Sequence, residues 1–266
     1  MGLRGQFSNL SDSLSDLVSH SLTAPDEEEE RSEATATAGW PDSRRRFGTV
    51  SGAILRALAE ADDALSVRAI RTEVERLLAV GSGRVAIPVA QATGRRVVGI
   101  DSSPAMLEQA RVRAVEEGVE LDLREGDIRE LEIEEPAALI YCPGRSLLHL
   151  PTWGDRRRCF ERVAASLRPN GRFAWNAFAF DHHFASAIDG RHADTPLPHT
   201  NHYSVSDNRV DITLDAGGTG SLWWATKNEW LGLLDVAGLR LEALYGGFAG
   251  EPLDDNSPEY VFVTRR

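Results

Sequence analysis

Cysteines and long hydrophobic segments are both scarce in this sequence. Its two cysteines, Cys142 and Cys159, form neither a zinc-ligand spacing nor a disulfide framework, which is typical of proteins from a reducing cytoplasm. No apolar run approaches the roughly 20 residues of a membrane-spanning helix. Ser, Asp and Asn interrupt the N-terminus, which lacks the apolar stretch of a signal peptide. We therefore expect a cytoplasmic protein with no membrane association.

Basic residues are outnumbered by acidic ones. The 29 Lys and Arg residues stand against 41 Asp and Glu, so the formal net charge is -12 at pH 7. Nucleic acids and anionic membranes bind basic surfaces, so this balance argues against a general nucleic-acid partner and leaves only a local basic patch open. A hydrophobic content of 42% with 26% charged residues is ordinary for a globular protein. The composition leaves the oligomeric state open.

The N-terminal quarter of the chain differs from the rest. Residues 1–47 are rich in Ser, Thr, Ala and Glu and poor in large apolar residues, which predicts a disordered acidic tail. Residues 48–76 show apolar positions at helical spacing and predict a helical segment. Within it, residues 50–76 resemble the opening helices of a winged-helix DNA-binding domain, but no recognition helix or wing follows. A helix pair that packs on the next domain is the favoured interpretation, and a DNA-binding regulator is the alternative.

From Leu77 onward, short apolar segments alternate with helical ones. This alternation predicts an α/β fold with a doubly wound parallel sheet and helices on both faces. The expected strands cover residues 77–80, 95–101, 119–127, 137–143 and 171–180, and the expected helices cover residues 83–93, 103–118 and 155–169.

Residues 181 to about 222 interrupt this rhythm. Their pattern favours antiparallel strands, so we expect a small inserted β cap over the edge of the sheet. A last helix begins after Thr226, a suitable N-cap. The segments 239–249 and 259–266 then predict a hairpin that closes the sheet. The domain is thus expected to cover residues 77–266, with the insert inside it.

Three successive strand ends carry residues suited to a nucleotide-containing ligand. In a doubly wound sheet, ligands bind beyond the carboxyl ends of the strands. Gly81 and Gly83 follow the first strand, where glycine lets the backbone approach a ligand. Asp101 ends the second strand and is placed to accept the hydroxyls of a ribose. Asp127 ends the third strand and is placed to accept the exocyclic amine of adenine, with Ile128 against the ring.

These segments resemble the class I S-adenosylmethionine-dependent methyltransferases. The similar stretches are "AVGSGRVAIPVA", "VVGIDSSPAMLEQAR" and "LREGDIREL", followed by "LRPNGRFAWNAF" at the fifth strand. The resemblance implies a Rossmann-like seven-stranded sheet with an antiparallel last strand, and S-adenosylmethionine as the cofactor. It implies methyl transfer to an oxygen or nitrogen, less so a carbon, of a small molecule. The cofactor-binding residues implied are Ala79, Gly81, Gly83, Asp101, Ser102, Met106, Asp127, Ile128, Tyr141 and Cys142.

Two positions depart from this family pattern. The family carries an acidic residue two positions before its first glycine, where this sequence has Leu77, and Ala79 replaces that glycine. In the family, the carboxylate helps to organise the methionine end of the cofactor. Its absence leaves open an alternative, a protein of the same fold that binds the cofactor but has weak or no transfer activity.

The acceptor side is less clearly marked. His149 and His182 are the candidate catalytic bases, because histidine titrates near neutral pH. Arg145 is a candidate for an anionic acceptor, with an exposed ion pair as the alternative. Trp175 and Trp223 are candidates for an acceptor pocket, with packing as the alternative. The adjacent His182 and His183 are expected to point apart on a strand, and no carboxylate pattern completes a site, so we expect no metal.

Overall fold

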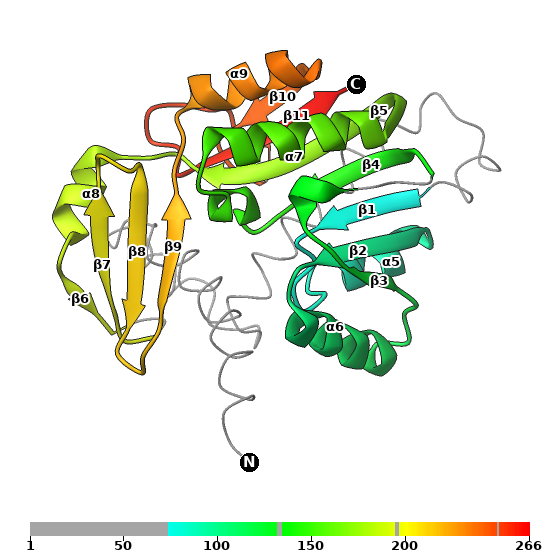
Figure 1. Ribbon diagram of the computed structural model, residues 1–266, viewed down its shortest axis with the longest axis horizontal. Helices are drawn as coiled ribbons and strands as arrows, with labels where there is room; N and C mark the ends of the chain where they lie inside the picture. The colour runs from blue at the N-terminus through cyan, green and yellow to red at the C-terminus, as the bar shows by residue number, and fades with distance from the viewer. Residues whose placement is uncertain (1–73, 132–134, 195–196, 249) are drawn as a thin grey trace.

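A mixed seven-stranded sheet forms the centre of the described chain (Figure 1). The computed structural model describes residues 74–131, 135–194, 197–248 and 250–266. Within them, the sheet order is β10-β11-β5-β4-β1-β2-β3. Strands β1 to β5 run parallel to one another, and β11 runs antiparallel to both β5 and β10. The strands are β1 (Val74–Leu78), β2 (Arg96–Asp101), β3 (Asp122–Glu125), β4 (Ala137–Cys142), β5 (Leu167–Phe178), β10 (Arg240–Tyr245) and β11 (Glu259–Arg265). The predicted fold class and the closing hairpin are confirmed.

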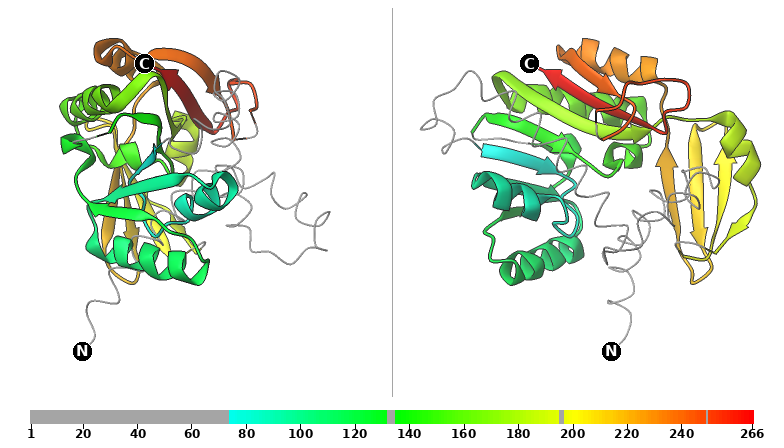
Figure 2. Two further views of the ribbon diagram at one scale, coloured as in Figure 1. Left: turned by 90° about the vertical axis from the view of Figure 1, so that its right-hand side faces the viewer. Right: turned by 180° about the vertical axis from the view of Figure 1, so that it is seen from behind.

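Helices cover both faces of this sheet (Figures 1 and 2). Neighbouring residues of β1 point to opposite faces, as side chains in a strand do. Leu77 packs with residues of α5 (Ala86–Thr93) and α6 (Pro104–Glu116), whereas Leu78 belongs to the core under α7 (Trp153–Ser166) and α9 (Lys227–Ala237). Both leucines are fully buried. The two cores thus pack against opposite faces of the sheet.

The core beneath α7 and α9 is built around aromatic rings. Trp175 on β5 stacks on Phe173 at 4.7 Å and on Phe262 at 4.6 Å between ring centroids, and Phe160 meets it edge-on at 5.1 Å. Trp175 is only 3% exposed. The prediction that Trp175 lines an acceptor pocket is therefore not supported by its position, because its ring is enclosed by other rings and stabilises the sheet.

The insert forms a second, antiparallel sheet beside the carboxyl ends of the central strands (Figure 1). It begins with the helix α8 (His182–Ile188). Its strand order is β6-β7-β8-β9, with β6 at His192–Ala193, β7 at His199–Ser204, β8 at Arg209–Leu214 and β9 at Thr219–Trp223. Inward-facing residues such as Val210, Ile212 and Leu222 join the core beneath α7. The predicted β cap is thus present and packed onto the domain.

The first strand begins earlier than expected. β1 starts at Val74, which pairs with Arg96 of β2, so residues 74–76 are strand rather than the end of a helical segment. Arg76 is buried in this strand, and its guanidinium donates to the backbone carbonyl of Glu135 at 2.7 Å. Because Arg76 is charged, this segment lacks the continuous apolar run from which a buried strand is predicted. The tail and the remainder of the predicted helical segment lie outside the described residues.

Candidate active site

A cavity of about 570 Å³ lies at the carboxyl ends of the parallel strands. It is formed by the loops that follow β1, β2, β3 and β4, including the short helices η3 (Ile128–Glu130) and η4 (Ser146–His149). This volume is typical of pockets for small molecules and cofactors. The predicted site residues that line it are Ala79, Gly81, Asp101, Ser102, Met106, Asp127, Ile128 and His149.

The loop after β1 alternates between left-handed and ordinary backbone. Ala79, Gly81 and Gly83 have φ values of 53°, 54° and 80°. An added Cβ on Gly81 would have no atom within 4 Å, so this residue is open to the cavity. A Cβ on Gly83 would lie 3.3 Å from side-chain atoms of Ala110 and Ile87, so this residue permits the close approach of α5 and α6. Ala79 adopts the conformation that favours glycine although it carries a Cβ.

Replacing Ala79 with glycine is expected to stabilise the fold. A left-handed residue with a Cβ costs about 1–2 kcal/mol, and glycine loses about 0.4–1 kcal/mol more chain entropy on folding. Ala79→Gly should therefore raise the free energy of unfolding by about 0.5–1 kcal/mol, measured by urea denaturation. Ala92→Gly, at an exposed position of α5, is the matched control and should lower it by a similar amount. A loss of stability in Ala79→Gly would contradict the strain at this position.

Leu77 occupies the place of the expected carboxylate as a core residue. It is 0% exposed and lies in the apolar cluster that contains Val85, Leu107 and Leu139. An ionised carboxylate among these side chains would lose its hydration without a partner. The loop thus keeps the glycine-type backbone but has no acidic side chain at this position.

Asp101 ties two of the cavity loops together. Its Oδ2 accepts from the backbone N–H of Gly81 at 2.8 Å, and its Oδ1 accepts from the backbone N–H of Ser103 at 2.9 Å. Ser103 caps α6 by accepting from the N–H of Met106. The structure therefore brings Gly81, Asp101 and Met106 together, as the sequence predicts.

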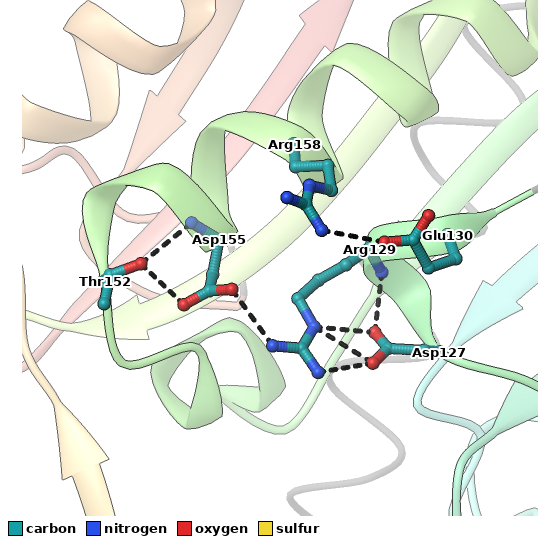
Figure 3. Close-up of polar contacts among 6 residues, drawn as sticks. All are labelled: Asp127, Arg129, Glu130, Thr152, Asp155 and Arg158. Atoms are coloured by element: carbon teal, nitrogen blue, oxygen red, sulfur yellow. Dashed lines mark hydrogen bonds and ion pairs between the residues drawn. The ribbon is translucent and has the colours of Figure 1, made fainter.

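Asp127 lies in a network of charged side chains (Figure 3). Its carboxylate accepts from the backbone N–H, Nε and Nη2 of Arg129, at distances between 2.5 and 3.0 Å. Nη1 of Arg129 donates to Asp155 at 3.0 Å. Hydrogen bonds from Arg129 hold the pKa of Asp127 below its ordinary value, and the two carboxylates raise the pKa of Arg129. Sequence reasoning missed Arg129 and Asp155, and the only local signal was a basic residue two positions after Asp127.

His149 lies at the opposite side of the same cavity, at the end of η4. Loss of water around the imidazole lowers the pKa of His149, while the charge of Asp101 and a hydrogen bond to the backbone of Ser221 oppose this shift. Ser221 belongs to β9 of the inserted sheet. One ring nitrogen is thereby oriented by the insert, and a neutral ring leaves the other nitrogen as a hydrogen-bond acceptor.

Three predicted residues at or near the end of β4 turn away from the cavity. Tyr141 and Cys142 are buried on opposite faces of the sheet and do not line it, and burial raises the pKa of the Cys142 thiol. Arg145 is also buried, and its guanidinium pairs with Glu259 on β11. Asn176 donates to the other oxygen of Glu259 at 3.2 Å. The expectation that Arg145 faces an anionic acceptor is corrected, because its guanidinium is buried in an ion pair with Glu259.

Two further candidates lie on the insert, outside the cavity lining. His182 is exposed at the start of α8, and its ring lies 3.9 Å from that of His183, so the pair does not point apart on a strand as expected. Trp223 is half-buried on β9, and its carbonyl accepts from the guanidinium of Arg156. The catalytic role of His182 and the acceptor role of Trp223 stay predictions. Within the described part of the chain, no three His, Cys, Asp or Glu side chains gather in a way that could hold a metal.

Known proteins share both sequence and fold with this chain. The family model for a methyltransferase domain matches residues 77–171. The dTDP-4-amino-2,3,4,6-tetradeoxy-D-glucose N,N-dimethyltransferase of Saccharopolyspora spinosa is 27% identical over 212 residues, which cover 73% of this chain and 84% of that protein.

No helix of the described residues combines the length and apolar character needed to cross a membrane.

Solved structures agree with this match. An S-adenosylmethionine-dependent methyltransferase from Clostridium acetobutylicum superposes with a TM-score of 0.70 at 15% identity, covering 82% of this chain and 91% of its own. CalS10, an amino pentose methyltransferase from Micromonospora echinaspora, superposes with a TM-score of 0.61 at 18% identity, covering 92% of this chain and 98% of its own. These likenesses establish the fold.

Proposed function

Because this chain carries the methyltransferase domain of the class I S-adenosylmethionine-dependent enzymes, we propose that it methylates an amine of a small sugar-like acceptor. The observation that carries the proposal is one cavity that holds Asp101 and Asp127 at its cofactor side and His149 at its other side. The first two residues suit a nucleoside, and the third suits an acceptor that must lose a proton. The sulfonium of the cofactor supplies an electrophilic methyl group.

The cavity residues fit this cofactor. Gly81 offers open space beside the backbone for the methionine portion, and Asp101 has carboxylate oxygens at the cavity wall for the ribose hydroxyls. Asp127 and Ile128 also line the cavity, where the carboxylate would accept a hydrogen bond from the exocyclic amine of adenine and the isoleucine would pack on the ring. Pro143 and Gly144 line the cavity at the end of β4, between this part and His149. The order of these residues along the sheet edge follows the length of the cofactor.

His149 serves as the base in this proposal. A primary or secondary amine is largely protonated at neutral pH and must lose a proton before its lone pair can attack. The lowered pKa keeps the imidazole neutral at that pH, and the contact with Ser221 orients it. Methyl transfer also requires the nucleophile and the methyl carbon to be held in line at close range. The neighbouring Leu150 and Pro151, which line the cavity beside His149, restrict where an acceptor can lie.

The nitrogen acceptor is favoured over oxygen by the relatives. The Saccharopolyspora spinosa protein is an N,N-dimethyltransferase of an amino sugar nucleotide, and a further protein of the same fold is named a sugar N-methyltransferase. The test is incubation with S-adenosylmethionine and either dTDP-4-amino-2,3,4,6-tetradeoxy-D-glucose or its 4-hydroxy counterpart, read by mass spectrometry. Methylation of the amine alone supports the proposal. Methylation of the hydroxyl alone would overturn the choice of nitrogen.

A second candidate is a cofactor-binding protein with weak transfer activity. The fully buried Leu77 favours it, because the carboxylate that serves the methionine end in the family has no counterpart there. Isothermal titration with S-adenosylhomocysteine, combined with the mass assay, separates the two functions. Micromolar binding without any methyl transfer to amines would favour this second candidate. The DNA-binding alternative rests on residues 50–76, of which the structure describes only 74–76, as part of β1, and salt-dependent DNA binding tests it.

A further inference from the structure

Both oxygens of the Asp127 carboxylate accept hydrogen bonds from one neighbouring residue. Its Oδ1 accepts from the backbone N–H of Arg129 at 2.8 Å and from Nε at 3.0 Å. Its Oδ2 accepts from Nε at 3.0 Å and from Nη2 at 2.5 Å (Figure 3). A carboxylate offers about four lone-pair positions. Arg129 therefore occupies nearly all the acceptor capacity that an adenine amine would need.

Arg129 has a second anionic partner on another element. Its Nη1 donates to Oδ1 of Asp155 at 3.0 Å. Asp155 is held at the start of α7, where its other oxygen accepts from the hydroxyl of Thr152 at 2.5 Å. This contact uses a guanidinium nitrogen that does not contact Asp127. The guanidinium is thus able to leave Asp127 while its charge stays paired with Asp155.

Asp127 and Arg129 lie in the cavity wall, so a bound adenine and the guanidinium of Arg129 would compete for the same carboxylate. Asp127, Ile128 and Arg129 all line the cavity at the end of β3. Resting on the proposed function, in which Asp127 accepts from adenine, we propose that Arg129 is a displaceable competitor that sets the affinity and selectivity of the adenine subsite. The adenine amine takes one oxygen of Asp127, and the guanidinium shifts toward Asp155. A base without an N–H donor at this position cannot replace the hydrogen bonds that Arg129 donates to Asp127.

The direct test is the substitution Arg129→Met, which keeps length and removes the charge. Affinity for S-adenosylhomocysteine, measured by isothermal titration, should rise about three- to tenfold, because the amine no longer displaces an ion pair whose side chains are only 37% and 34% exposed. Arg111→Met is the matched control. Arg111 on α6 is exposed, pairs with Glu108 at 3.3 Å and does not line the cavity, so its removal should leave the affinity unchanged. Circular dichroism verifies that both variants are folded.

Three further measurements separate competition from a general loosening of the loop. In an Asp127→Ala background, Arg129→Met should no longer raise affinity, because the contested acceptor is gone. Asp155→Asn should act in the opposite direction and lower affinity about two- to fivefold, because the displaced guanidinium loses its charged partner. Thermal unfolding of Asp155→Asn checks that α7 remains intact. The preference for S-adenosylhomocysteine over its purine riboside analogue, which has hydrogen in place of the exocyclic amine, should widen in Arg129→Met.

The outcomes divide clearly. An Arg129→Met affinity equal to or below that of the wild type would overturn the competition, as would a gain that persists in the Asp127→Ala background. Wild-type binding with an unchanged Arg129→Met affinity leaves the proposed function standing and defeats only this inference. Absence of binding to both proteins at millimolar ligand would defeat the proposed function and this inference together.

Discussion

Substitution of Asp101 by alanine is expected to weaken binding of S-adenosylhomocysteine about a hundredfold or more. Hydrogen bonds to a charged group contribute about 1.5–3 kcal/mol each, and the carboxylate is placed to accept both ribose hydroxyls. Its removal also frees the N–H groups of Gly81 and Ser103, which it holds at 2.8 and 2.9 Å. The loss therefore combines missing ligand contacts with a looser loop. Isothermal titration measures it.

Two further variants test whether the loss of affinity in Asp101→Ala comes from the missing carboxylate. Asp101→Asn keeps one acceptor oxygen and should give an intermediate affinity. Glu125→Ala is the matched control, since Glu125 pairs with Asp101 in register at the end of β3 but is exposed and does not line the cavity. Its affinity should equal that of the wild type. If Asp101→Ala binds within fivefold of the wild type while remaining folded, the ribose assignment is wrong.

Substitution of His149 by glutamine should lower kcat for amine methylation about a hundredfold or more and leave cofactor affinity unchanged. General base catalysis contributes about 10²- to 10⁴-fold, and glutamine keeps a polar side chain of similar size but accepts no proton at neutral pH. The split between kcat and cofactor affinity separates this role from a structural one. His202→Gln, an exposed position on β7, is the control and should retain full activity.

The pH profile gives a second signature of the same residue. Burial lowers the pKa of His149 below its ordinary value of 6.5, so the neutral form persists to lower pH. The base must be unprotonated to act, so kcat should fall as pH drops through this lowered pKa. The limb set by His149 is thus expected below pH 6.5 in the wild type and should be absent in His149→Gln, whose remaining pH dependence is that of the acceptor amine. An identical acidic limb in both proteins would remove His149 from the proton transfer.

The sequence predicts those parts of the site that depend on strand ends. Asp101 and Asp127 could be placed because parallel strands bring their carboxyl ends to one edge, and each carboxylate directly follows an apolar segment. The glycine loop was recognised from local spacing, and the structure shows left-handed backbone at Ala79 as well as at both glycines. His149 follows the fourth strand by the same logic. Local order along the chain is sufficient for all of these residues.

Contacts between distant segments could not be read in this way. Arg145 looked like a loop residue free to meet a ligand, but its partner Glu259 lies 114 positions away on β11. The position of Trp175 in β5 does not tell whether its ring faces a ligand pocket or the core. The contacts with Phe160 and Phe262 show that the ring is enclosed in the core. Arg129 and Asp155 are 26 positions apart and meet because η3 lies against α7. Such partners follow from tertiary packing, which the local pattern does not encode.

The contact between His149 and the backbone of Ser221 has a consequence for how acceptor choice can change. His149, the proposed base, follows β4 of the central sheet, whereas the backbone group that it contacts belongs to β9 of the insert. Grafting another insert to obtain a new acceptor specificity would also replace the strand that orients the proton acceptor. Because the contact is made by main chain, a graft needs only a strand of the same path at this point and no particular side chain. If His149 is the base, side chains of the insert can change without loss of the backbone contact that orients its ring.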